Sequence, residues 1–298
     1  RHPTMSVHPV TPMDEADVRR HLARQTDLPV DVADLLVLKS SAMPPAPQGP
    51  AIRAFDVVDA ETLAAAGRAI LTEAARRPVF AIGSQGLEYA LVAALGQPAP
   101  HIHDAKPVER IAVVSGSASP DTARQIAAAE AQGFGAIPFD AAAVESRAME
   151  AQAERAEAAA LATLDRGRSP IIYTTRGPDD PALGRTRQAR AAADLPDDAA
   201  NRALAETLGR LLARIADRAR LPRVAIAGGD TSSHATRALG PQALTAEAHI
   251  APGAPLLAAH RDGLPPLGLV LKGGQMGADD IFARIRDGGT AAVGKETA

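Results

Sequence analysis

The sequence predicts an α/β protein of two domains, in which mostly parallel sheets are flanked by helices. Short apolar runs alternate with longer helical patterns, and this order is typical of parallel strands joined by helical crossovers. A length of 298 residues favours two domains over one. The proline-rich segment 97–109 has no periodicity, so we expect it to be the linker between a domain at 1–96 and a domain at 110–290.

The N-terminal half begins with a marked helix signal, because Thr11 can cap a helix in which Pro12 takes the first position. Apolar runs and an alanine-rich stretch then continue the alternation. Strands are expected over 55–58 and 78–82, and helices over 62–76 and 87–95.

The same alternation restarts after the linker. The predicted strands are 111–114, 136–139, 171–173 and 224–227, and the predicted helices are 120–132, 141–166 and 198–220. After Ala227 the pattern changes, because the runs 245–257 and 267–271 resemble strands without long helices between them. We therefore expect a mixed sheet in this domain, closed by a helix over 278–286 and followed by a loose tail, 291–298.

Composition excludes several classes of protein. The formal net charge of −3 is close to neutral and aromatic residues make up 2%, so nucleic-acid binding is not expected. The absence of Cys excludes disulfides and thiolate chemistry. No apolar stretch approaches the roughly 20 residues that span a bilayer and no signal peptide is visible, so we expect no membrane partner and a cytoplasmic location. The chain opens at Arg1, and we expect it to begin partway through a larger protein, with a start at Met5 as the alternative.

Three turns carry most of the functional information, since each follows a short apolar run and consists largely of glycine and small polar residues. A strand that ends in such a turn and enters a helix presents bare backbone N–H groups, which bind anions together with the positive end of the helix dipole. In one doubly wound sheet such turns meet at the carboxyl ends of the strands. We therefore predict a cleft for a nucleotide, with these contacts: Ser115, Gly116, Ser117, Ser119, Gly228, Gly229, Asp230, Thr231, Ser232, Lys272, Gly273 and Gly274.

Two charged residues in these turns have more than one interpretation. The Asp230 carboxylate repels phosphate, so it is expected to hold a Mg²⁺ ion, to bind a ribose hydroxyl or to cap its helix. Lys272 is expected either to neutralise phosphate or to lie solvated in a flexible loop. Taken alone, the turns at 115–119 and 228–232 also fit a capped helix start without a ligand, and the turn at 272–277 also fits a flexible loop. The G-x-x-x-x-G-K-[ST] and G-x-G-x-x-G patterns of common nucleotide-binding loops are absent.

One turn in the N-terminal half, Gly83-Ser84-Gln85, has the same strand–turn–helix form. It is a candidate for a second ligand site, that of a substrate, and a plain tight turn is the alternative.

Taken in order, these turns resemble the four-carbon acid sugar kinase family, long described as a domain of unknown function. The matching stretches span most of the chain: 8–13, 83–86, 114–120, 173–177, 227–232 and 271–277. The resemblance implies two α/β domains, with ATP in the C-terminal one and phosphorylation of sugar acids such as threonate, erythronate or 3-oxo-tetronate; a relative acts on 3-oxo-isoapionate. It also implies nucleotide contacts from the Ser115–Ser119 turn, the Gly228–Thr231 turn and Gly274.

One part of the family pattern is missing from this sequence. The family opens with paired aspartates followed by Thr-Gly, and later has an Asp-Ser-Thr-x-Arg-Gly run that binds the sugar acid; neither occurs here. We therefore expect 1–96 to be a partial sugar-acid-binding domain, and the general base to lie outside these residues.

The sequence thus predicts an ATP- and Mg²⁺-dependent sugar-acid kinase, of which this chain holds the ATP-binding part. A nucleotide-binding module without catalysis and an NAD(P)-dependent hydroxy-acid oxidoreductase are the alternatives. Alanine-rich faces permit a homodimer without requiring one.

Overall fold

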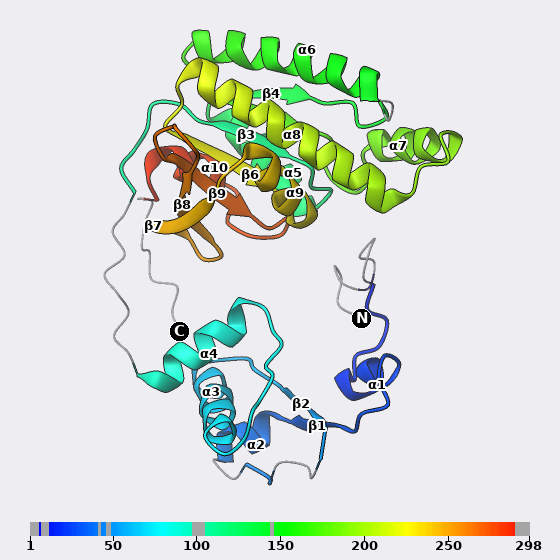
Figure 1. Ribbon diagram of the computed structural model, residues 1–298, viewed down its shortest axis with the longest axis vertical. Helices are drawn as coiled ribbons and strands as arrows, with labels where there is room; N and C mark the ends of the chain where they lie inside the picture. Colours follow the sequence, from blue (N-terminus) through cyan, green and yellow to red (C-terminus); the bar gives the residue numbers. More distant parts are fainter. Residues whose placement is uncertain are drawn as a thin grey trace. The chain divides into compact units, whose positions relative to one another are not determined.

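A computed structural model describes residues 6, 12–40, 43–45, 49–96, 105–143 and 146–289 (Figure 1). The described residues divide into two compact units, those up to Gly96 and those from Ala105 onward. Residues 97–104 of the predicted linker and the predicted tail, 291–298, lie outside the described residues.

The C-terminal unit contains a seven-stranded mixed sheet in the order β4-β5-β3-β6-β9-β8-β7. The first five of these strands pair in parallel, and β8 and β7 continue the sheet in antiparallel fashion. The strands are β3 (Ala112–Ser115), β4 (Gly135–Pro138), β5 (Pro170–Tyr173), β6 (Arg223–Ala227), β7 (Ala243–Ala251), β8 (Ala254–His260) and β9 (Leu267–Lys272). This arrangement confirms the predicted fold class, including the mixed sheet.

Helices cover both faces of this sheet, because successive strand residues point to opposite sides. Val114 of β3 packs in a core with α6, α8 and α9, whereas Val113 packs in a second core with α5 and α10. The helices are α5 (Pro120–Ala131), α6 (Ser146–Asp165), α7 (Pro181–Ala192), α8 (Asp197–Ala219), α9 (Gly229–Leu239) and α10 (Ile281–Asp287) (Figure 1). Of these, α7 was not anticipated from the sequence, although Asp180 caps it and Pro181 takes its first position.

The N-terminal unit is smaller and holds a two-stranded parallel sheet, β1-β2. Its elements are α1 (Val18–Ala23), β1 (Val30–Ala33), α2 (Leu35–Ser40), β2 (Ile52–Phe55), α3 (Ala60–Ala74) and α4 (Gln85–Leu95). Its core cluster of buried residues consists of Ala33, Leu38, Ala65 and Ala66. Helices α3 and α4 approach so closely that a Cβ on Gly67 would lie 1.9 Å from the Ala90 carbonyl oxygen.

Three elements expected in this half were wrong. The first helix begins at Val18 rather than near Pro12, because the Asp17 side chain accepts a hydrogen bond from the Arg19 N–H and caps the helix there. The strand expected over 55–58 ends at Phe55, where the pairing with β1 stops. The strand expected over 78–82 does not form, because it has no neighbouring strand among the described residues to supply hydrogen bonds.

Candidate functional site

The three glycine-containing turns lie side by side at one edge of the C-terminal sheet. They follow β3, β6 and β9, which are adjacent parallel strands and therefore end at the same edge. Backbone hydrogen bonds join each turn to the next strand: Gly116 N donates to the Ala227 oxygen at 3.1 Å, and Gly228 N donates to the Lys272 oxygen at 2.8 Å. The structure thus brings together the three segments that the sequence placed in one cleft.

Glycine is required where these turns meet. A Cβ on Gly116 would lie 2.2 Å from Thr231 Oγ1, and a Cβ on Gly274 would lie 2.8 Å from Ser117 Oγ. Gly228 has a φ of +118°, which disfavours any residue with a side chain. The turns therefore pack against one another with no room for added atoms on their facing sides.

Helix α9 offers its N-terminal N–H groups at this edge. It begins at Gly229 after Gly228, and its N-cap makes no side-chain hydrogen bond. The Gly229 and Asp230 N–H groups find no acceptor in the part of the chain that the structure describes. Asp230 is exposed and lies in the first turn of the helix, so it does not act as the cap. An anion at this end would meet unpaired donors and the positive end of the helix dipole.

The serine-rich turn after β3 uses its hydroxyl groups largely to build itself. Ser117 is buried, and its Oγ accepts a hydrogen bond from Ser119 N at 3.2 Å. Ser119 is the N-cap of α5 and accepts from Asp121 N at 3.2 Å. The turn is therefore a capped helix start, as one interpretation of the sequence expected. An anion bound here would contact backbone N–H groups as well as hydroxyls.

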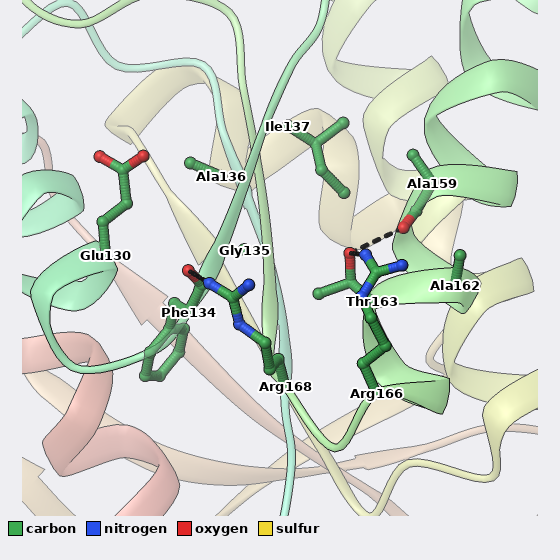
Figure 2. A pocket seen from close by; sticks show the side chains of 10 residues that line it. All are labelled: Glu130, Phe134, Gly135, Ala136, Ile137, Ala159, Ala162, Thr163, Arg166 and Arg168. Atoms are coloured by element: carbon green, nitrogen blue, oxygen red, sulfur yellow. Dashed lines mark hydrogen bonds between the residues drawn. The ribbon is translucent and has the colours of Figure 1, made fainter.

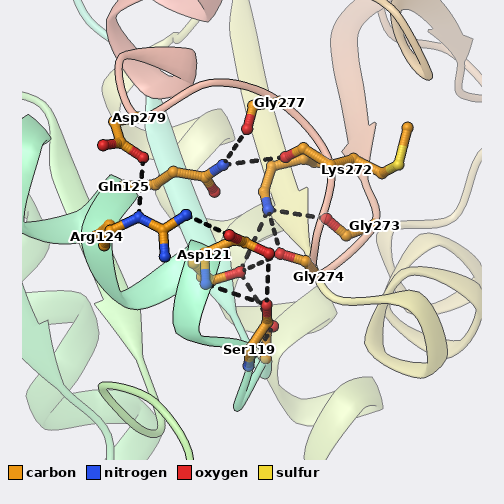
Figure 3. A network of polar contacts seen from close by, with 12 residues as sticks. Ser119, Asp121, Arg124, Gln125, Lys272, Gly273, Gly274, Gly277 and Asp279 are labelled. Atoms are coloured by element: carbon orange, nitrogen blue, oxygen red, sulfur yellow. Dashed lines mark hydrogen bonds and ion pairs between the residues drawn. The ribbon is translucent and has the colours of Figure 1, made fainter. Parts of the chain in front are cut away.

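Lys272, at the end of β9, is buried with 0% of its surface exposed. Its Nζ donates to the Gly273 oxygen at 2.8 Å, the Gly274 oxygen at 2.9 Å and Thr122 Oγ1 at 3.2 Å (Figure 3). Burial lowers the pKa of Lys272 to about 8, and the nearby Asp121 carboxylate opposes part of that shift. The expectation of a solvated lysine in a flexible loop is wrong, because the ammonium is buried and hydrogen-bonded to three protein oxygens. Neutralisation of phosphate by Lys272 stays a prediction.

A fourth turn, at the end of β5, lies beside the other three at the carboxyl ends of the parallel strands. Its residues were not among the predicted nucleotide contacts. Thr174 N donates to the Ser115 oxygen at 3.0 Å, so this turn lies beside the serine-rich one. The Arg176 guanidinium stacks over the Tyr173 ring at 4.6 Å and pairs with Glu130. The signal was present in the sequence, because 173–177 also follows an apolar run and also contains a glycine.

The candidate substrate turn belongs to the N-terminal unit. Gly83 and Ser84 precede α4, which begins at Gln85, and the Ser84 side chain makes no cap hydrogen bond. All three residues are exposed. Their proposed contact with a substrate stays a prediction.

A groove of about 590 Å³ lies elsewhere in the C-terminal unit, between β4 and the end of α6 (Figure 2). Two of its lining residues, Gly135 and Arg168, stand at or just before the amino ends of β4 and β5, so it is remote from the carboxyl ends where the turns meet. Arg168 donates to the Gly133 and Phe134 oxygens and thereby supports the chain there. This groove lies beside β4, the outer strand of the sheet, and is not part of the candidate site.

The described residues were also compared with the requirements of a metal site and of a membrane-spanning helix. Among the residues that the structure describes, no group of three or more His, Cys, Asp or Glu side chains is placed to hold a metal ion. Within those same ranges, no helix has both the length and the apolar content needed to cross a bilayer.

Both parts of the chain match family models of known proteins. A family model described as a nucleotide-binding C-terminal domain matches residues 112–282, and one described as a sugar-binding N-terminal domain matches residues 1–91. A 3-oxo-isoapionate kinase from Paraburkholderia graminis is 45% identical, over 98% of this chain and 65% of its own length. A 3-oxo-tetronate kinase from Methylobacterium radiotolerans is 32% identical, over 94% of this chain and 65% of its own.

Solved structures agree with these matches. A Salmonella typhimurium protein superposes with a TM-score of 0.65 at 25% identity, covering 95% of this chain and 65% of that one. A Haemophilus influenzae protein gives a TM-score of 0.57 at 25% identity, covering 95% and 66%.

The matched domains define a protein that combines a sugar-binding and a nucleotide-binding domain. The chain belongs to the four-carbon acid sugar kinase family, which confirms the resemblance seen in the sequence. It spans about 65% of the length of the two curated relatives described above.

Proposed function

We propose that the protein is an ATP-dependent kinase for a four-carbon sugar acid of the threonate, erythronate or 3-oxo-tetronate type. The observation that carries the proposal is the meeting of three glycine-containing turns at the carboxyl ends of β3, β6 and β9. The two kinases similar to this chain support the choice of reaction and of substrate class. The match to a nucleotide-binding domain supports the choice of site.

The residues at this edge fit a triphosphate. Glycines stand where backbones come closest, and the unpaired N–H groups of Gly229 and Asp230 begin a helix of 11 residues. Phosphoryl transfer depends mainly on positioning the reactants and on stabilising the charge of the phosphate oxygens, and fixed backbone donors do both. We assign to these turns the tasks of binding the phosphates and orienting them.

Asp230 is the residue that would hold Mg²⁺. It is exposed beside the turn, and Mg²⁺ in nucleotide sites commonly takes one or two carboxylates together with phosphate oxygens. When bound, the ion would neutralise phosphate charge.

The sugar acid would bind to the N-terminal unit, where Gly83, Ser84 and Gln85 are the candidate contacts. The match of 1–91 to a sugar-binding domain supports that placement. No residue of this chain is assigned as the general base. A cytoplasmic location and a homodimer remain predictions.

The test combines binding with turnover. We expect calorimetric titration of the 298-residue chain with Mg²⁺ and ATP to give a single site. Gly274→Ala should weaken binding by about tenfold, because the new Cβ would lie 2.8 Å from Ser117 Oγ and displace the turn. Gly184→Ala is the matched control, since a Cβ there meets nothing within 4 Å.

The outcomes separate the candidate functions. ADP release that depends on added threonate, erythronate or 3-oxo-tetronate would support the kinase. Binding without turnover would support the non-catalytic module. Absence of ATP binding by the wild-type chain would contradict the proposal.

A further inference from the structure

A buried cation stands directly behind the turn that follows β9. The Lys272 side chain has no exposed surface, and within the described residues its Nζ contacts no carboxylate. Its partners are two backbone oxygens and one hydroxyl. Burying an ammonium costs free energy of folding even when it is hydrogen-bonded, so stability alone does not explain a lysine at this position.

The two backbone oxygens fix the direction of two N–H groups. In a trans peptide the C=O and the N–H of one plane point in opposite directions, and the described residues contain no cis peptide. Since the Gly273 and Gly274 oxygens face Lys272 Nζ, the Gly274 and Gln275 N–H groups point away from it. Neither N–H finds an acceptor among the described residues. Two successive N–H groups of this kind form an anion-binding nest.

Helix α5 holds the same turn from its buried side. Thr122 Oγ1 lies 2.7 Å from the Gly274 oxygen and 3.0 Å from Ser117 Oγ, and it accepts from Lys272. Gln125 Nε2 donates to the Met276 oxygen at 3.0 Å and to the Gly277 oxygen at 2.8 Å. Both side chains are fully buried. The carbonyls of Gly273, Gly274, Met276 and Gly277 thus face Lys272 or α5.

We propose that Lys272 is a positioning residue of the nucleotide site: its ammonium holds the Gly273 and Gly274 carbonyls, so that the Gly274 and Gln275 N–H groups face the phosphates, and it does not itself contact phosphate. This inference rests on the proposed function, because it names the group that orders one of the three turns.

The experiment compares Lys272→Met with wild type in the 298-residue chain. Methionine keeps most of the length of the side chain and removes the donors. We expect the dissociation constant for Mg²⁺ and ATP, measured by calorimetry, to rise by about tenfold to a hundredfold, the range for losing about one hydrogen bond to a charged group. The melting temperature should stay the same or rise, because the buried charge is gone. Lys106→Met removes a charge from an exposed position and should bind as wild type does.

A second measurement keeps the inference independent of ATP binding. In the ligand-free chain, hydrogen exchange over 273–277, followed at the Met276 amide that donates to the Gly273 oxygen, should be faster in Lys272→Met than in wild type, while exchange in β3 stays unchanged. Thr122→Val removes the hydroxyl that links Lys272 to the turn and should show the same local change if Lys272→Met does not fold.

The failures can be told apart. Absence of ATP binding by wild type contradicts the proposed function, and exchange over 273–277 still decides the role of Lys272. Unchanged exchange and unchanged affinity in Lys272→Met, or equal weakening in Lys106→Met, would overturn the inference. A nucleotide-bound crystal structure with Lys272 Nζ at hydrogen-bond distance from a phosphate oxygen would overturn it as well.

Discussion

The two units of this chain show what the same alternation of apolar runs and helices produces with and without enough neighbouring strands. In the C-terminal unit, Val113 and Val114 of β3 are both 0% exposed, because the strand is paired on each side and covered on each face. In the N-terminal unit no residue of β2 is fully buried, and Phe80 and Ile82 are 95% and 99% exposed. An apolar run is therefore a strand only where other strands supply its hydrogen bonds.

The largest expected effect tests this contrast by truncating one apolar side chain in each unit. Leu212→Ala in α8 should lower the free energy of unfolding of the C-terminal unit by about 2–5 kcal/mol, because Leu212 is fully buried in its core. Phe80→Ala should change the free energy of unfolding by less than about 0.5 kcal/mol, because the Phe80 side chain is almost fully exposed and buries little surface. Urea unfolding followed by circular dichroism measures both.

A comparable loss in Phe80→Ala would show that this side chain is packed in solution, and that the contrast between the two units is smaller than described. The sharper form of the test follows hydrogen exchange. Amides of β3, β6 and β9 should be the most protected, and those of α3 and β2 should exchange by easier local opening.

The second expected effect compares one lysine from each unit. Lys272 is buried and its pKa is lowered to about 8, whereas exposed Lys39 pairs with Asp59, which raises its pKa. Bound phosphates favour the ammonium form of Lys272, so nucleotide affinity should be full below pH 8 and should fall as pH rises above it. Calorimetric titrations between about pH 7 and 9.5 measure the change, with Lys272→Met as the pH-insensitive control.

Stability should move in the opposite direction over the same range. The folded-state pKa of Lys272 lies below its ordinary value of 10.5, so between these values the unfolded chain binds more protons than the folded one. The contribution of this group to stability therefore rises as pH increases from about 8 to 10.5. An affinity that stays flat while stability rises would separate Lys272 from the nucleotide site.

The smallest expected effect concerns one ion pair from each unit. The Arg176 guanidinium holds the pKa of Glu130 below its usual range, yet both side chains are more than a third exposed. Glu130→Gln should thus cost about 0.2–1 kcal/mol in urea unfolding. Asp31→Asn in the N-terminal unit removes the cross-strand partner of Arg53 in β1-β2 and should cost a similar amount or slightly more, because Arg53 is better buried. A larger loss of stability in Glu130→Gln than in Asp31→Asn would contradict the expectation that the better-buried pair contributes more.

Most of the C-terminal unit could be predicted because its signals are local. Ser119 followed by Pro120 marks the start of a helix in sequence and in structure, and the leucines of α8 recur at the spacing of one buried face. The role of Lys272 could not be predicted, since its burial depends on Thr122, 150 positions earlier in the chain. The same limit explains the strand wrongly expected over 78–82, where composition favours a strand but no partner is described.

A nucleotide titration followed by NMR would show whether the three turns bind the phosphates together. The chain has 24 glycines, so labelling with [¹⁵N]glycine gives a spectrum with few signals. On addition of Mg²⁺ and ATP, we expect the amide signals of Gly228, Gly229 and Gly274 to shift together with one dissociation constant, while that of Gly184 stays in place. Saturable binding that leaves those three signals unmoved would contradict a phosphate site built from these turns.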